Sequence, residues 1–190
     1  MKYLGMMLAA VIFFAACKNT DDKKTDETAP VTAEKAPYSE GFNASFGKLL
    51  NGYFALKDAF IEGDTSAVNA KGVELKTIID SLQLTELQQK DSLAFESING
   101  RPGDVSAEIT GMLGESTIQK KRESFEMISN ALYDIVRAVR PANQPIYYLF
   151  CPAAFDSKGA YWLSNTEAPQ NPYADKKEAP CGEVKETLKY

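Results

Sequence analysis

The chain has 190 residues, of which 26 are acidic and 21 basic, and its net charge at pH 7 is −5. An acidic chain whose basic residues are scattered is a poor match for nucleic acid, so we expect no nucleic-acid partner. The sequence has no histidine, which excludes the common catalytic triads and histidine general bases. It also lacks CxxC, HExxH, phosphate-loop and nucleophile-elbow motifs, and we therefore expect a protein that is not an enzyme.

Residues 1–16 have the organisation of a secretory signal peptide. One lysine precedes an apolar stretch that is shorter than the ~20 residues needed to cross a bilayer and that ends in small residues. Residues 14–17 (FAAC) resemble a bacterial lipobox, with Phe14 in place of the usual leucine. The resemblance implies that Cys17 is acylated and anchors a lipoprotein in the cell envelope, at the outer membrane and facing the periplasm. The alternative is an ordinary signal cut that leaves Cys17 unmodified.

Residues 17–37 are expected to form a disordered tether that begins at the lipidated cysteine. Charged residues, threonine, alanine and two prolines dominate, and after Cys17 the only sizeable apolar side chain is Val31. Such a composition cannot bury enough surface to offset the entropy of ordering. The folded part is therefore expected in residues 38–190, a length that suits one domain with its own core.

Two helices are predicted first. Apolar residues recur at three- and four-residue steps over residues 41–61, which indicates one buried helix face. Gly63 is a suitable residue to end that helix, and Asp64 is placed to cap the next one, which runs to about Ser81.

Further helices follow. Residues 84–99 have a weaker helical pattern and end at a breaker, residues 99–103 (NGRPG). Asp104 is expected to start another helix, and the clearest pattern runs over residues 118–140 until Pro141 stops it. The chain is thus predicted to be mainly α, an antiparallel bundle of four to five helices.

The pattern changes from about residue 144. Residues 144–151 are rich in aromatic and β-branched side chains, residues 151–159 supply turn chemistry, and residues 160–163 form a second short strand. Because a lone hairpin is marginal in water, we expect this C-terminal β-hairpin to cap one end of the bundle. The remaining residues are predicted to be an irregular tail.

Four C-terminal segments resemble an uncharacterised bacterial envelope domain: residues 148–154 (YLFCPAA), 158–164 (KGAYWLS), 171–173 (NPY) and 181–184 (CGEV). That domain occurs as envelope lipoproteins and appended to periplasmic adaptors of heavy-metal efflux pumps. The resemblance implies a helical bundle with a C-terminal hairpin and an association with copper and related metals; it brings no established activity. The likeness covers most of residues 42–187, and these upstream residues contribute to it: Tyr53, Leu56, Lys57, Asp58, Ile118, Arg122 and Phe125.

Two positions depart from the pattern of that domain, which has methionines where this chain has Ala153 and Glu178. Two cysteines with two methionines would be a good site for Cu(I). Here Cys151 and Cys181 are the only conventional soft ligands at this end of the chain, and one carboxylate is a poor site for a harder metal. The sequence therefore favours no metal site, with copper on the reduced cysteines as the alternative.

The number of cysteines favours a disulfide. The chain has three, and acylation of Cys17 would leave Cys151 and Cys181 as a pair in an oxidising compartment. A bond between them would close a loop of about 30 residues and contribute on the order of 3 kcal/mol in the entropic model. A metal–thiolate site and free thiols stay open as alternatives.

Two smaller groups are expected to be structural. The basic run at residues 120–122 is expected to be a solvated helix face, although Arg122 alone could turn inward to pair with a carboxylate. Met112 and Met127 are expected to fill the core.

The C-terminal aromatic residues have two interpretations. They could form a platform for a ligand, but a core between hairpin and bundle is favoured. The candidate ligand residues among them are Tyr148, Tyr161, Trp162 and Tyr173, and the rest of the cluster is Tyr147, Phe150 and Phe155.

Two function classes follow. The first is a non-enzymatic binding or accessory module of the cell envelope, linked to heavy-metal handling or efflux, with a metal-efflux adaptor or another envelope complex as partner. The second is a structural or protein-interaction lipoprotein without a metal role, whose cysteines only stabilise the fold.

The lipobox-like junction gives the first prediction. Replacing Cys17→Ser should release a soluble protein, because no other segment of the sequence is long and apolar enough to span a bilayer. Fractionation of cells that express the wild-type and variant proteins measures this. A variant that stays with the membrane after a salt wash would show that the anchor lies elsewhere.

Overall fold

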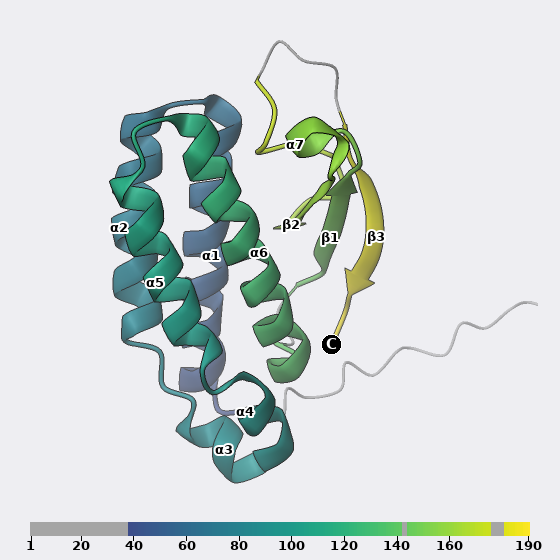
Figure 1. Cartoon of the computed structure of the whole chain (residues 1–190). Helices are drawn as coiled ribbons and strands as arrows, with labels where there is room; N and C mark the ends of the chain where they lie inside the picture. Colours follow the sequence, from purple (N-terminus) through teal and green to yellow (C-terminus); the bar gives the residue numbers. More distant parts are fainter. Residues whose placement is uncertain (1–37, 142–143, 176–180) are drawn as a thin grey trace, which may run out of the picture. The chain divides into compact units, whose positions relative to one another are not determined.

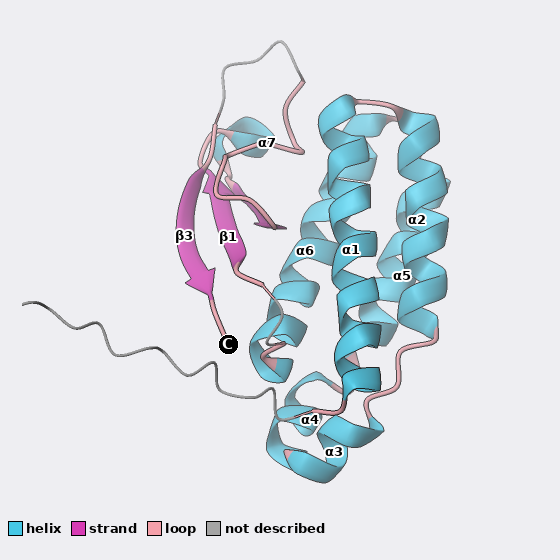
Figure 2. Ribbon diagram, turned by 180° about the vertical axis from the view of Figure 1, so that it is seen from behind, coloured by secondary structure: helices cyan, strands magenta, loops and turns pink. Residues whose placement is uncertain are grey.

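The computed structural model describes residues 38–141, 144–175 and 181–190, and it is mainly helical with a small three-stranded antiparallel sheet. The predicted signal peptide, Cys17 and the tether lie outside these residues. Figures 1 and 2 show four long helices, α1, α2, α5 and α6, side by side, with α3 and α4 at one end. In the part of the chain that is described, no helix combines the length and the apolar character needed to cross a membrane.

The first two helices begin and end where the sequence predicts. Helix α1 (Glu40–Glu62) ends at Gly63, which has a φ of +72°, a left-handed conformation that suits glycine. Helix α2 (Thr65–Asp80) begins at Asp64, whose carboxylate accepts the backbone amides of Ser66 and Ala67.

The segment predicted as one helix over residues 84–99 is two short helices, α3 (Thr85–Lys90) and α4 (Ser92–Ile98). Asp91 separates them. Its backbone is extended (φ −147°, ψ +84°), and its side chain accepts the amide of Ala94 in the first turn of α4. In a continuous helix the amide of Ala94 would bond to a main-chain carbonyl one turn earlier. Here the Asp91 side chain accepts it, so the chain can break at Asp91 and start a new helix.

Helix α5 (Arg101–Gly114) starts three residues earlier than predicted, inside the residues expected to break the chain. The reason is that Pro102 occupies the first turn, where its missing N–H leaves no helical hydrogen bond unmade. Asp104, predicted as the start, lies in the first turn and carries a negative charge close to the N-terminus, where the helix dipole favours it.

Helix α6 (Ile118–Val139) matches the prediction for residues 118–140. Thr117 caps its start, and Arg140 ends it with a φ of +54°. One face of α6 is buried through most of its length, and the apolar residues on that face are Phe125, Ile128, Leu132, Ile135, Val136 and Val139.

Helices α1 and α6 meet through Tyr53. Its ring stacks on Phe125 with 5.2 Å between centroids, and its hydroxyl lies 2.7 Å from the Ser129 Oγ. Ser129 donates its own hydrogen to the Phe125 carbonyl, so the hydrogen between the two hydroxyls comes from Tyr53. The Tyr53 oxygen also accepts the backbone amide of Leu163, which joins both helices to the sheet.

The sheet has the order β2-β1-β3, and all its strands are antiparallel: β1 (Ile146–Cys151), β2 (Ala160–Ser164) and β3 (Glu183–Leu188). The two predicted strands are present. The prediction of an irregular tail is wrong for β3, where three charged side chains hide the strand pattern and pairing with β1 decides the conformation. The sequence predicts that the hairpin caps one end of the helices. Figures 1 and 2 instead show the sheet alongside α6.

The contact between α1 and α6 gives the second prediction. Replacing Phe125→Ala should lower the free energy of unfolding by about 3–5 kcal/mol, because the ring is fully buried between Tyr53 and Phe60. Met127→Ala on the same helix is the matched control. Met127 was predicted to fill the core, but it is 56% exposed, and its removal should change stability by less than about 0.5 kcal/mol. Chemical denaturation measures both, and a loss below 1 kcal/mol for Phe125→Ala would contradict this packing.

Candidate functional site

A cavity lies where α6 begins. It has a volume of about 1070 Å³ and opens to solvent. Its walls are the first two turns of α6, the connection between β1 and β2, residues 171–175, and the pair Cys151 and Cys181. Residues from four distant parts of the sequence therefore meet at one place.

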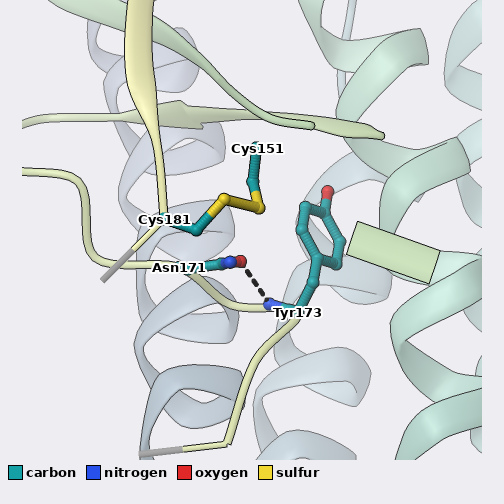
Figure 3. The surroundings of a disulfide bond; sticks show 4 residues. All are labelled: Cys151, Asn171, Tyr173 and Cys181. Carbon is teal, nitrogen blue, oxygen red and sulfur yellow. Dashed lines mark hydrogen bonds between the residues drawn. A yellow bond between two sulfur atoms is a disulfide. The ribbon is translucent and has the colours of Figure 1, made fainter. Parts of the chain in front are cut away.

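Cys151 and Cys181 form the disulfide that the cysteine count predicts, with 5.3 Å between their Cα atoms. The bond joins the last residue of β1 to the segment that leads into β3. The two cysteines differ in exposure, since Cys151 is 1% exposed and Cys181 is partly exposed. Figure 3 shows the sulfur–sulfur bond with Asn171 and Tyr173 beside it.

Arg122 holds residues 171–175 against α6. The guanidinium is only 3% exposed, and it donates to the Pro172 carbonyl at 3.1 Å and to the Ala174 carbonyl at 2.8 Å. It also pairs with the Asp175 carboxylate at 3.0 Å. The inward turn suggested for Arg122 is present, and its partners include two main-chain carbonyls as well as a carboxylate.

The rest of the basic run is only partly the solvated face we predicted. Lys120 is exposed and pairs with Glu123 at 2.7 Å. Lys121 is buried and donates to the carbonyls of Met112 and Leu113 at the end of α5, at 2.7 and 3.3 Å. Burial lowers the pKa of Lys121. The charge lies where a helix C-terminus favours a cation, so this lysine caps α5. Met112 itself is buried, as predicted.

Tyr173 forms the floor of the cavity. Its hydroxyl donates to the Tyr161 carbonyl, and its backbone amide donates to the Asn171 side chain at 2.9 Å. Its ring lies against Phe125 and Trp162, with centroids at 6.0 and 5.9 Å. Burial raises the pKa of Tyr173, which keeps the phenol protonated and able to donate. This candidate ligand residue thus links the sheet to α6.

The other three candidate aromatic residues also have their ring faces occupied. Trp162 is fully buried. Tyr148 lies between Tyr133 and Tyr161, with centroids at 3.9 and 4.8 Å, and the other face of Tyr161 is covered by Phe150 at 4.4 Å. A ligand that stacks needs an open ring face. These rings therefore serve packing in this conformation.

The connection between β1 and β2 has a conformation that the sequence did not predict. Three successive residues, Phe155, Asp156 and Ser157, have φ of 52°, 57° and 67°, so the short element α7 (Ala154–Ser157) is a left-handed turn. Such a turn costs roughly 1–2 kcal/mol per residue. Gly159 follows with a φ of +80°, and a Cβ there would lie 2.4 Å from the Phe150 ring. Gly159 was the residue of this connection whose type most clearly indicated a left-handed backbone from the sequence.

The side chains that could ligate a metal are not grouped together in the described residues. In residues 38–141, 144–175 and 181–190, no group of three or more histidine, cysteine, aspartate or glutamate side chains is arranged to hold a metal ion. Ala153 lines the cavity beside the disulfide, and Glu178 lies outside the described residues. The two sulfur atoms are bonded to each other, so neither is a thiolate.

The fold and site together define a mainly helical protein with a disulfide-bonded sheet on one side. A family model described as "Protein of unknown function (DUF3347)" matches residues 49–144, half of the chain, and the chain belongs to this family. No curated protein and no solved structure matches the chain. The matched residues include Tyr53, Arg122 and Phe125 and end before Cys151.

The disulfide gives the third prediction. The double change Cys151→Ala with Cys181→Ala should lower the free energy of unfolding by about 3 kcal/mol, because the bond closes a loop with a sequence separation of 30. Denaturant titration of the wild-type and variant proteins measures the difference. In protein isolated under alkylating conditions, neither cysteine should be alkylated. Two alkylated cysteines would mean that the native protein is reduced.

Proposed function

We propose that this protein is a non-enzymatic accessory module of the cell envelope, anchored through Cys17, that binds at the cavity beside the Cys151–Cys181 disulfide and acts in heavy-metal handling. One observation carries the proposal: both cysteines line a cavity of about 1070 Å³ that opens to solvent, and Cys181 is partly exposed. The resemblance to envelope lipoproteins and to domains of heavy-metal efflux adaptors supports the metal link.

The position of the cavity suits a module that is attached at residue 38. The amide and hydroxyl of Ser39 both donate to the Glu86 carboxylate in α3, at 2.6 Å each, which fixes the start of α1 against α3. These hydrogen bonds and the nearby Lys90 lower the pKa of Glu86 to about 2. The cavity lies at the other end of the long helices, near α7 (Figure 1). The cavity and the start of α1 therefore lie at opposite ends of the long helices.

The proposed metal chemistry depends on the redox state of the cysteines. When the bond is reduced, Cys151 and Cys181 would offer two thiolates, the ligand type that Cu(I) prefers. In the oxidised protein the sulfur atoms have given up the thiolate charge, and Ala153 supplies no further soft ligand. We therefore propose that the oxidised form binds Cu(I) negligibly and that only the reduced form binds it.

The second candidate is a structural or protein-interaction lipoprotein without a metal role. The observation that favours it is that the disulfide and Arg122 hold the same segment of chain, as expected of a purely structural bond. In that case the cavity would accept part of an envelope protein, and reduction would change stability without creating a metal site.

A Cu(I) titration against a coloured chelator separates these functions and gives the fourth prediction. Fully reduced protein should take up about one equivalent of Cu(I), while the oxidised protein and the Cys151→Ser, Cys181→Ser variant should take up almost none. The double variant is the matched control, because it has neither the two thiolates nor the disulfide at these positions. Equal, negligible binding by all three would remove the metal role and leave the protein-interaction function.

A further inference from the structure

The two sulfur atoms of the disulfide are unequal targets for a thiol. Cys151 is buried at the end of β1, whereas Cys181 is partly exposed in the cavity wall. A thiolate from solution should therefore approach Cys181 more readily than Cys151. Attack on Cys181, however, releases the negative charge on the Cys151 sulfur, in a buried position where desolvation disfavours a charged group.

This arrangement makes reduction slow as long as the native packing persists. Attack on the more exposed Cys181 must displace the buried Cys151 sulfur, which is the poorer leaving group. Attack on Cys151 would displace the better leaving group, Cys181, but Cys151 is buried. Most of residues 171–175 line the same cavity as both cysteines, so their movement away from α6 should make Cys151 easier to reach from solvent. Figure 3 draws two of these residues, Asn171 and Tyr173, in the surroundings of the disulfide, and both line the same cavity.

Arg122 is the side chain that keeps residues 171–175 in place. It makes three contacts with them, to Pro172, Ala174 and Asp175, from a buried position on α6. Hydrogen bonds from a charged donor are stronger than those between neutral groups. Asp175 is 70% exposed, so solvent weakens that ion pair, and the two carbonyl contacts provide most of the hold.

We propose that Cys181 is the site of thiol–disulfide exchange with a dithiol reductant, and that Arg122 is a positioning residue that limits the rate of this exchange. The inference rests on the proposed function in one respect, because reduction would produce the form that binds a soft metal. Its test contains no metal, so the two proposals can fail separately.

The reaction balances with a dithiol as reductant. One of its thiolates bonds to the Cys181 sulfur while the Cys151–Cys181 bond breaks, and the electron pair leaves on the Cys151 sulfur, which takes up a proton. The second thiol of the reductant then attacks the mixed disulfide and displaces Cys181 as a thiol. The protein gains two electrons and two protons, and the reductant becomes a cyclic disulfide.

The chain has a built-in reporter for this reaction. Trp162 is its single tryptophan, and it is fully buried. The indole packs against Gly182, where a Cβ would lie 2.8 Å from the ring. Because Gly182 follows Cys181, release of the disulfide should change the environment and the fluorescence of Trp162.

The experiment measures the rate at which dithiothreitol reduces the folded protein, by Trp162 fluorescence and by alkylation with mass spectrometry. Arg122→Ala should be reduced about tenfold faster than the wild-type protein or more. Arg122→Lys should be intermediate, because lysine keeps the charge and loses the planar donor arrangement. Lys71→Ala, a change on α2 at a partly exposed residue that does not line the cavity, should leave the rate unchanged.

Two further measurements separate positioning from general destabilisation. Leu132→Ala removes a buried side chain of α6 that does not line the cavity, and it should accelerate reduction less than Arg122→Ala does. In concentrated guanidinium chloride, where the packing is lost, all variants should be reduced at the same rate. If Arg122→Ala does not fold, Asp175→Asn provides the milder test and should give a smaller acceleration in the same direction.

The target sulfur is identified with a monothiol. 2-Mercaptoethanol, followed by an acid quench and peptide mapping, should give a mixed disulfide on Cys181 and not on Cys151. A mixed disulfide on Cys151, or wild-type reduction rates in the Arg122 and Asp175 variants, would overturn the proposal. An equal acceleration in Leu132→Ala would also overturn it, because exchange would then follow global unfolding.

Discussion

The described part of the chain depends on one buried hydroxyl group. Tyr53 donates to Ser129 on α6 and accepts the amide of Leu163 on β2, so a single side chain of α1 joins three elements. A buried polar group without its partners costs about 1–3 kcal/mol, which makes the three positions strongly dependent on each other. Burial also raises the pKa of Tyr53, so the phenol stays protonated and keeps its donor. The contact gives an outer amide of β2 a partner, and an edge strand of a sheet otherwise exposes such amides.

The small sheet is held by more than its own hydrogen bonds. The sheet has only three short strands, and a long connection separates β2 from β3. The disulfide fixes the end of that connection, and Arg122 fixes residues 172–175 within it. Tyr173 adds a contact between the two, since it reaches Tyr161 with its hydroxyl and Phe125 with its ring. The covalent bond and the buried cation thus stabilise residues 165–175 and 181–182, which belong to no helix or strand.

The family match ends at residue 144, but the tertiary contacts continue across that boundary. The match covers residues 49–144 and therefore the long helices. Tyr53, Arg122 and Phe125 lie within it, yet each has partners in the C-terminal residues that the match leaves out. The helices and the sheet consequently form one packed unit, in which the helices position the cavity and the C-terminal residues supply most of its walls.

The sequence by itself determined the features that depend on neighbouring residues. Gly63 and Asp64 mark the junction of α1 and α2 because capping is local, and the buried face of α6 follows from the spacing of its apolar residues. The disulfide was predicted from the number of cysteines and from an expected oxidising compartment. The candidate site was predicted only as far as this pair and the inward turn of Arg122.

Tertiary structure alone decided the rest. Lys121 lies inward because the carbonyls at the end of α5 accept its hydrogens, whereas Met127 on the same helix is exposed. The strand β3 exists because β1 offers it an edge, and the left-handed turn at residues 155–157 persists because the surrounding packing offsets its cost. A one-dimensional pattern records the preference of each segment, but the partner that each segment finds is a property of the folded chain.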